Sequence, residues 1–273
     1  MVNHRRYKYS LLRCLMLCAC IVLNLEVRTM AANSLNRNMF MLSNLNTDQG
    51  LSSARVYSIL QAEDGAMWIS TKRGVDRYNG QMVSNYDLAT DTWFSDASGR
   101  NIKLVKDAHQ NIYAYDNKGK VYIYNKVKDD FILKFNLLKM LGGSLVVNEV
   151  VVDNQGNFWM AMDKGLYFYP VKEGAKSGDA PNASTKPCGK YVLKNTYINH
   201  LRFIGRTLFI GVPDGAYVYS PHAHQLKRVL TGCSVLSSYH DVKQHQLWLG
   251  TFHSGAKVLD DRNMKTLSLC QSI

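Results

Sequence analysis

Proline, acidic side chains and long apolar runs are all scarce in this chain of 273 residues. Only 5 residues are proline, whereas 16 are tyrosine, 9 phenylalanine and 4 tryptophan. Aromatic side chains favour β-strands. No segment beyond residue 31 keeps a 3.6-residue apolar period over an ordinary helix length, so a helical bundle is excluded. None is long and apolar enough to span a membrane, which takes about 20 residues.

Acidic residues are outnumbered by basic ones. The chain has 33 Lys and Arg against 21 Asp and Glu, a net charge of +12. The basic residues are scattered among expected strands and turns, with no run of five like charges. We therefore expect a solvated basic surface and no nucleic-acid partner. Affinity for acidic glycans stays open as a hypothesis.

Cysteines are too few for a disulfide framework. Three of the six lie within the first 31 residues, which leaves Cys188, Cys233 and Cys270. An odd count allows one bridge at most, such as Cys233 to Cys270, or else buried free thiols. No Cys-x-x-Cys pair or Cys/His zinc spacing occurs, so we predict no metal and no cofactor.

The first 31 residues are typical of an export signal. A basic start precedes an uncharged, mostly apolar stretch over residues 14–25. As a helix this stretch is about 18 Å long, shorter than a bilayer core of about 30 Å. We predict cleavage after Ala31 and a periplasmic location. The alternative is a lipid anchor on Cys20, within a lipobox-like sequence.

Beyond the signal, one motif recurs five times. Its aromatic anchors lie 45, 46, 50 and 39 residues apart, and its glycines keep register with them. The anchors are Trp68, Tyr113, Trp159, Phe209 and Trp248, and the glycines are Gly74, Gly119, Gly165, Gly215 and Gly255. This period predicts an all-β protein, a β-propeller with about five four-stranded blades. The blades are expected at 51–94, 95–140, 141–190, 191–230 and 231–273.

The repeat has a physical reason. A single blade cannot bury both of its faces, so neighbouring blades pack face to face around one large aromatic per blade. Each buried aromatic contributes about 1.5–3 kcal/mol. We therefore expect every anchor to lie in an inter-blade core. Glycine is expected to supply the positive φ of the turns, and Asn79-Gly80 predicts a type I′ hairpin.

The first copy closely resembles the two-component regulator propeller repeat. The resemblance rests on the strings QGLSS from Gln49, VYSI from Val56, WIST from Trp68 and RYNG from Arg77. It is specific in copies one, three and five and degenerate in copies two and four. It covers about residues 38–273.

This resemblance implies an oligosaccharide-responsive periplasmic sensor of a hybrid two-component system. Such sensors have two propellers, usually of seven blades, then an immunoglobulin-like domain, a membrane helix, a histidine kinase and a DNA-binding response regulator. This chain has room for only about five blades, so we expect an incomplete ring, and it has no kinase or receiver motif, so we expect it to work with a downstream kinase chain or a second propeller. Residues 39–42 are expected to form the strand that completes a last blade.

Local motifs suggest little catalysis, and no catalytic residue is predicted. Residues 153–157 resemble part of a calcium loop, but a hairpin turn explains them better. His222 and His224 would share a strand face at i, i+2 and could hold a metal, although surface placement is the simpler interpretation. The Asp-x-x-Gly-x-x-Trp pattern of copy three has the wrong spacing for a sialidase Asp-box.

The expected ligand face is formed by the loops that precede the blades. These loops lie near Ser52-Ser53, Arg100-Asn101, Ser144, Asn199 and Ser237-Ser238. No individual ligand-binding residue is predicted. The main hypothesis is a glycan-binding sensor module that is not an enzyme. The alternatives are a propeller-type polysaccharide lyase or hydrolase and a non-functional truncated sensor.

Overall fold

The computed structural model describes residues 43–88, 101–171 and 189–267. The chain divides into two compact units, Met1–Asn44 and Leu45–Ile273. The predicted export signal, the strand expected at 39–42, Cys188 and Cys270 lie outside the described residues. The second unit consists almost entirely of antiparallel sheets, which confirms the predicted fold.

The second unit contains five blades of four strands each. Blade one has β1 Val56–Gln61, β2 Met67–Thr71, β3 Gly74–Tyr78 and β4 Val83–Asp87; blade two has β5 Lys103–Lys106, β6 Ile112–Tyr115, β7 Lys120–Asn125 and β8 Asp130–Asn136. Blade three has β9 Val147–Val152, β10 Phe158–Met162, β11 Gly165–Tyr169 and β12 Lys190–Lys194. Blade four has β13 His200–Ile204, β14 Thr207–Val212, β15 Gly215–Ser220 and β16 Gln225–Thr231; blade five has β17 Ser234–Asp241, β18 Gln246–Phe252, β19 Ala256–Asp260 and β20 Thr266–Leu267.

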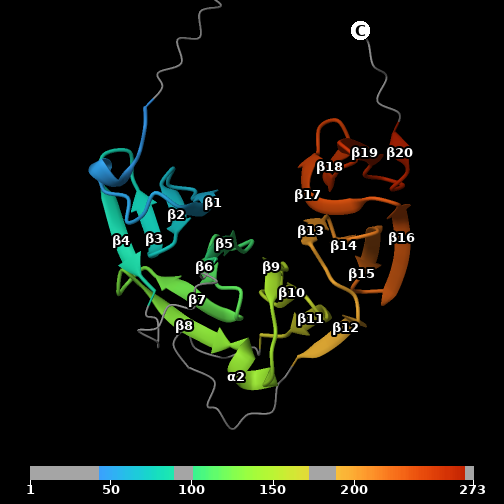
Figure 1. Ribbon diagram of the computed structural model, residues 1–273, viewed down its shortest axis with the longest axis horizontal. Coiled ribbons are helices and arrows are strands. Elements are labelled where there is room, and N and C mark those ends of the chain that lie inside the picture. The colour runs from blue at the N-terminus through green and yellow to red at the C-terminus, as the bar shows by residue number, and fades with distance from the viewer. Residues whose placement is uncertain (1–42, 89–100, 172–188, 268–273) are drawn as a thin grey trace, which may run out of the picture. The chain divides into compact units, whose positions relative to one another are not determined.

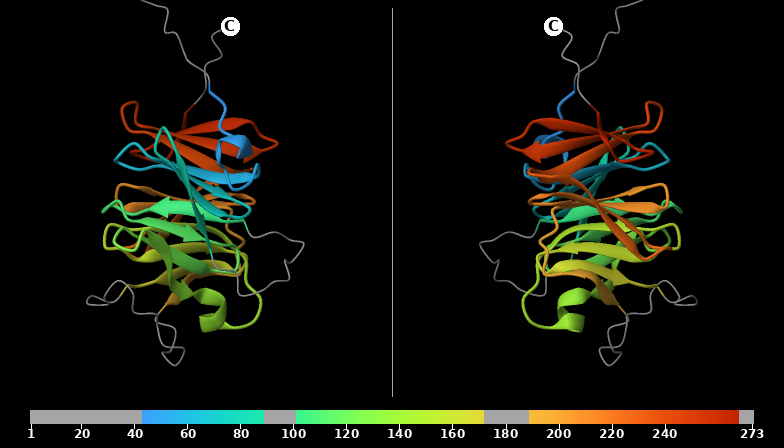
Figure 2. Two further views of the ribbon diagram at one scale, coloured as in Figure 1. Left: turned by 90° about the vertical axis from the view of Figure 1, so that its left-hand side faces the viewer. Right: turned by 90° about the vertical axis from the view of Figure 1, so that its right-hand side faces the viewer.

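The blades follow one another in sequence order, and the ring is not closed (Figure 1). The first strand of each blade lies beside the first strand of the next, from β1 through β5, β9 and β13 to β17. A one-residue parallel bridge between Gly215 and Ser234 joins blades four and five. Seen from the side, the hairpins of the blades project on two opposite faces (Figure 2).

Short helices and blade boundaries differ slightly from expectation. A 3-10 turn, η1 Thr47–Gln49, precedes blade one, and a five-residue helix, α2 Leu137–Leu141, follows blade two. The predicted boundary at 190/191 falls inside β12, and the one at 230/231 falls inside β16. In the described ranges, no helix has the length and apolarity that a membrane crossing requires.

Four of the five aromatic anchors lie in inter-blade cores, as predicted. Trp68, Tyr113, Trp159 and Phe209 are at most 4% exposed. Each packs against the following blade: Trp68, for example, contacts Tyr124 and Phe131 of blade two. These contacts explain why one large aromatic recurs with the blade period.

The prediction for Trp248 is wrong. Its side chain is 37% exposed, and Tyr239 and Phe252 on the same face of blade five are 64% and 58% exposed. Tyr239 lies opposite Trp248 in the ladder between β17 and β18, so both side chains point to the same side of the sheet. No described blade follows blade five, and its outer face is therefore uncovered.

Four of the five repeated glycines, Gly119, Gly165, Gly215 and Gly255, have the expected positive φ, and three of the five also allow a close approach of the backbone. A Cβ on Gly74, Gly165 or Gly215 would lie 2.2, 1.9 or 2.0 Å from a carbonyl oxygen of the fourth strand of its blade. Gly74 does not have a positive φ, so the expectation from turns is wrong there. Gly119 differs from these three, because a Cβ on it would meet the Leu137 side chain at 2.7 Å. Gly255 has φ +64 with open space around it, as a turn requires.

The Asn79-Gly80 hairpin is correctly placed but is not type I′. That type requires positive φ at both central residues. Gly80 has φ +97, whereas Asn79 has no positive φ. The Asn79 side chain instead accepts hydrogen bonds from the backbone N–H groups of Gln81 and Met82 at 2.9 and 2.8 Å. A side-chain cap therefore organises this turn.

Candidate functional site

Polar side chains of the innermost strands join one blade to the next. Between blades one and two, the Leu104 N–H donates to Ser58 Oγ at 2.9 Å. Between blades two and three, Lys103 Nζ donates to the Asn148 carbonyl at 2.8 Å. These groups satisfy one another across the interfaces, so they hold the blades in register.

The same pattern continues through blades three, four and five. Glu149 accepts a 2.7 Å hydrogen bond from the Leu201 N–H and forms a 2.7 Å ion pair with His200. His200 Nε2 is 2.7 Å from Ser238 Oγ of blade five. A carboxylate and an imidazole thus connect three blades, and we assign His200 a structural role.

The loops predicted to form a ligand face are partly committed to internal contacts. Ser52 donates from its hydroxyl to Asp76 at 2.9 Å, and Asn199 donates to Ser234 Oγ at 3.1 Å. Asn101 and Ser144 are exposed, and Arg100 lies outside the described residues. A ligand role for these loops stays a prediction.

Asp153 belongs to a hairpin rather than a calcium loop. Its Oδ1 accepts from the backbone N–H groups of Gln155 and Asn157, both at 2.9 Å. Its Oδ2 accepts from Trp159 Nε1 at 3.0 Å and from Asn157 Nδ2 at 3.1 Å. Asp107 of blade two caps its hairpin in the same way and reaches Tyr113 Oη at 3.0 Å. The acid at this position therefore fixes the anchor aromatic.

His222 and His224 lie in the turn between β15 and β16, not on a strand, so the predicted shared strand face is wrong. His224 has φ +52, a conformation that suits a turn. Over the described ranges, no group of three or more His, Cys, Asp or Glu side chains could hold a metal ion. Cys233 is a buried free thiol.

At the interface of blades one and two, the space beside the anchor is filled. Tyr86 stacks on Trp68 with ring centroids 5.5 Å apart, and Tyr124 meets Trp68 edge-on at 4.6 Å. The Tyr86 and Tyr124 hydroxyls both donate to Asp129, at 2.8 and 2.5 Å. The hydrogen bond from Tyr124 and, to a lesser extent, the one from Tyr86 hold the pKa of Asp129 below its usual value. Burial raises the pKa of Tyr86.

The interface of blades three and four has the same framework. Tyr219 of blade four corresponds to Tyr124 of blade two. Each is the residue directly after the cross-strand partner of the aromatic anchor in its blade. Five residues further along the chain, His224 occupies the place of Asp129, and both have positive φ. His224 Nδ1 lies 3.2 Å from the Tyr219 hydroxyl. The tyrosine and its turn partner are thus retained, with a carboxylate exchanged for an imidazole.

One difference leaves this second interface open. In blades one and three, the residue that follows the first glycine of the third strand pairs with a residue of the fourth strand. This cross-strand partner is Tyr86 in blade one and Leu193 in blade three. Leucine has no ring to stack on Trp159 and no hydroxyl to reach the turn. The space that Tyr86 fills in the first interface therefore remains as a groove beside Leu193 in the second.

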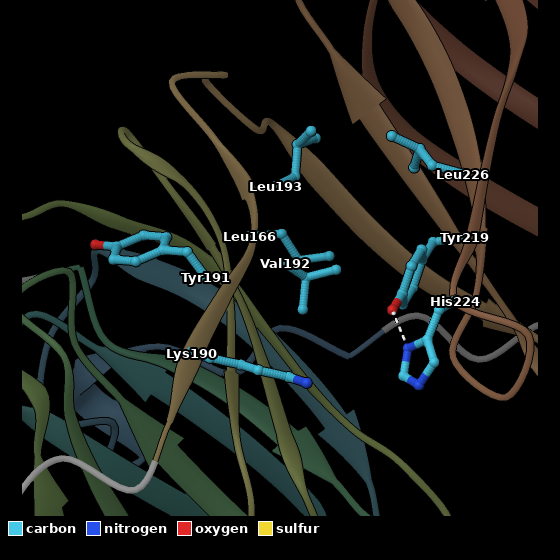
Figure 3. A pocket seen from close by; sticks show the side chains of 8 residues that line it. All are labelled: Leu166, Lys190, Tyr191, Val192, Leu193, Tyr219, His224 and Leu226. Atoms are coloured by element: carbon cyan, nitrogen blue, oxygen red, sulfur yellow. Dashed lines mark hydrogen bonds between the residues drawn. The ribbon is translucent and has the colours of Figure 1, made fainter.

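The groove consists of two adjoining hollows between β12 and the β15–β16 turn. Their volumes are about 570 and 310 Å³, and they share Lys190, Val192, Tyr219 and His224. Figure 3 shows the smaller hollow, where Lys190 points across the space toward the Tyr219–His224 pair. Burial raises the pKa of Tyr219. The larger hollow lies within the size range of small-molecule sites.

A row of cross-strand neighbours forms one wall of the larger hollow. Trp159 pairs with Phe168 across β10 and β11, and Phe168 pairs with Lys190 across β11 and β12. The Trp159 and Phe168 rings are 4.5 Å apart. Phe203 and Arg206 of blade four lie on the opposite wall. The half-buried ring of Phe168 thus lies beside the exposed side chain of Lys190.

The groove lies at the opposite ends of the strands from the loops predicted to bind ligand. Its walls include the hairpin that follows the first strand in blades three and four, whereas the predicted loops precede that strand. The sequence analysis missed this groove, because its walls come from segments far apart in the chain. The one signal available was the Lys190, Arg206 and histidine group clustered around copies three and four.

Comparison with known families agrees with the first repeat. The family model of the two component regulator propeller matches residues 50–73. The chain carries a two-component regulator propeller repeat. No curated protein matches the chain as a whole.

Solved structures share the propeller fold. The extracellular domain of the hybrid two component system BT4673 from B. thetaiotaomicron aligns with a TM-score of 0.59 at 18% identity, over 80% of this chain and 30% of that one. PorZ, a type-IX secretion component of Porphyromonas gingivalis, aligns at 0.55 with 13% identity, over 78% and 33%. The dihydro-heme d1 dehydrogenase NirN aligns at 0.51 with 13% identity, over 80% and 47%.

These similarities establish the fold and nothing finer. The chain spans about a third of the length of the two-component and PorZ proteins that it matches. The matched proteins include a sensor domain, a secretion component and an enzyme, so one fold carries unrelated functions. Function must therefore be argued from the groove.

Proposed function

We propose that this regulator propeller is the saccharide-binding module of an exported sensor in a hybrid two-component system. The observation that carries the proposal is the groove between blades three and four. Its walls combine Trp159, Phe168 and Phe203 with the polar groups of Asn154, Gln155 and Lys190. Saccharides bind to such surfaces by stacking apolar ring faces on aromatic rings and exchanging hydrogen bonds with amides.

The resemblance and the repeat motif support the sensory part of the proposal. The partner we propose is a kinase-bearing chain or a second propeller, which would convert binding into a signal. The location we propose is outside the cytoplasm, in keeping with the extracellular domain whose fold this chain shares.

The groove favours binding over hydrolysis. Glycosidases generally use two carboxyl groups that flank the scissile bond. The lining of the larger hollow contains one carboxylate, Asp153. Both of its oxygens accept hydrogen bonds from the hairpin and from Trp159. We therefore propose no catalytic residue.

Thermal unfolding with a panel of neutral and acidic oligosaccharides tests this function. A ligand present at 100 times its Kd stabilises the folded state by about 2.7 kcal/mol. Phe203→Ala should weaken this effect, whereas the matched control Phe252→Ala, an exposed phenylalanine on blade five, should not. No stabilisation by any saccharide would contradict the proposal. New reducing ends or unsaturated uronate in the mixture would instead indicate an enzyme.

A further inference from the structure

The basic side chains of the groove come together from three segments. Lys190 begins β12, Arg206 follows the end of β13, and His222 and His224 lie in the β15–β16 turn. Lys190 and Arg206 are exposed. Within the described part of the chain, neither side chain forms a hydrogen bond or an ion pair with the protein. The groove therefore offers two permanent positive charges that are available to a ligand.

The single carboxylate in the lining, Asp153, carries one negative charge against the two positive ones. Asp153 accepts four hydrogen bonds, from the N–H groups of Gln155 and Asn157 and from the side chains of Asn157 and Trp159. Each oxygen accepts two of them, so the acid is engaged in holding the hairpin. A carboxylate committed in this way is a poor partner for Lys190.

The closed interface between blades one and two has a carboxylate at the equivalent position. There the turn carries Asp129, whose carboxylate accepts hydrogen bonds from Tyr86 and Tyr124. In the open groove the same turn carries His224, and no acid faces the tyrosine hydroxyl. The interface of blades one and two is filled and contains the carboxylate of Asp129. The interface of blades three and four is open and is lined by basic side chains.

Lys190 is placed to contact a substituent on a stacked sugar. It lies opposite Phe168 in the β11–β12 ladder, and directly opposed residues have Cβ atoms about 4.5–5.5 Å apart. A ring stacked on Phe168 would therefore bring an exocyclic group within reach of the ammonium. We propose that the groove selects saccharides that carry an anionic group, a uronate carboxylate or a sulfate ester. This inference rests on the proposed function and narrows its ligand class.

Isothermal titration of the full chain with three tetrasaccharides tests the inference. The probes are a galacturonic acid tetramer, a sulfated galactose tetramer and the unsulfated galactose tetramer. We expect at least one acidic probe to bind about tenfold more tightly than the neutral one, a preference that weakens as salt is raised. The acidic probe that binds identifies carboxylate or sulfate as the source of the charge.

A matched pair of lysine variants locates the effect. Lys190→Met should weaken binding of the acidic probe about tenfold and leave the neutral probe unchanged. Lys194→Met removes the same charge from the other end of β12, outside the groove, and should change neither. Equal losses in the two variants would assign the effect to overall charge and overturn the inference.

The remaining outcomes separate this inference from the proposed function. If neutral and acidic tetramers bind equally well, the groove is a saccharide site without charge selection, and only the inference fails. If the neutral tetramer alone binds, the inference fails in the same way. If no saccharide in this set or in the broader panel binds, the proposed function fails as well.

Discussion

Replacing the same anchor in the first and last blades should have very different costs. Trp68 is 2% exposed, and its ring lies 5.5 Å from Tyr86, 4.6 Å from Tyr124 and 5.8 Å from Phe131. Truncating a buried tryptophan to alanine costs about 3–5 kcal/mol, because the transfer free energy is lost and a cavity remains. Trp248 is 37% exposed, so Trp248→Ala should cost only about 1 kcal/mol.

Urea-induced unfolding followed by far-UV circular dichroism measures this difference, since the signal does not depend on the tryptophans themselves. The free energy of unfolding in water follows from the midpoint and the m-value. We expect Trp68→Ala to be at least about 2 kcal/mol less stable than Trp248→Ala. Equal losses would mean that the outer face of blade five is covered in solution, for example by self-association, and would refute the reasoning.

Three further predictions concern stability. Burial raises the pKa values of Tyr113 and Tyr115. Their contribution to the free energy of unfolding is therefore complete below the unfolded-state pKa of about 10 and is lost as the pH rises above it. A free energy of unfolding that stayed constant from about pH 9 to 11 would contradict this. Gly165→Ala places a Cβ 1.9 Å from a carbonyl oxygen and should cost more than about 2 kcal/mol, whereas Gly156→Ala, with open space around it, should cost about 1 kcal/mol; calorimetry that ranked them in reverse would be inconsistent with the close-approach account. Glu149→Ala leaves a backbone N–H and an imidazole without their partner and should cost about 1–3 kcal/mol in urea unfolding, and an unchanged midpoint would show that the inter-blade polar contacts are dispensable.

The propeller could be predicted from the sequence because its repeat records a physical requirement. Each inter-blade core needs one large aromatic, so Trp68, Tyr113, Trp159 and Phe209 recur at the blade period and are buried as expected. Trp248 follows the same sequence pattern but is exposed, because burial depends on a neighbouring blade and not on the residue. The sequence period therefore predicts which side chains face a neighbouring blade position. Whether such a side chain is buried depends on a blade being present there.

The glycines were predicted in the right places for an incomplete reason. The expected positive φ is present at Gly119, Gly165, Gly215 and Gly255, and at Gly255 it is accompanied by free space. Gly165 and Gly215 are required because a backbone carbonyl of the fourth strand approaches within about 2 Å of where a Cβ would stand. That contact depends on the pairing of the third and fourth strands of a blade, so the rules for a single turn could not identify it.

The candidate site was not predictable from local motifs. The smaller hollow is lined by Leu193, which stands where blade one has Tyr86, and this correspondence appears only once the strand registers are known. For His222 and His224 the sequence favours surface placement over a metal pair, and the structure places them in a turn that lines an open hollow. Alignment of the blades by structure, rather than by sequence, reveals the exchange of Asp129 for His224.

A crystal structure of the chain with the acidic tetrasaccharide that binds most tightly would test the central claim most directly. Our account predicts a sugar ring on Phe168 in the groove between blades three and four, with its carboxylate or sulfate within hydrogen-bond distance of Lys190. A saccharide bound instead at the loops near Ser52 and Asn199, with the groove empty, would contradict it.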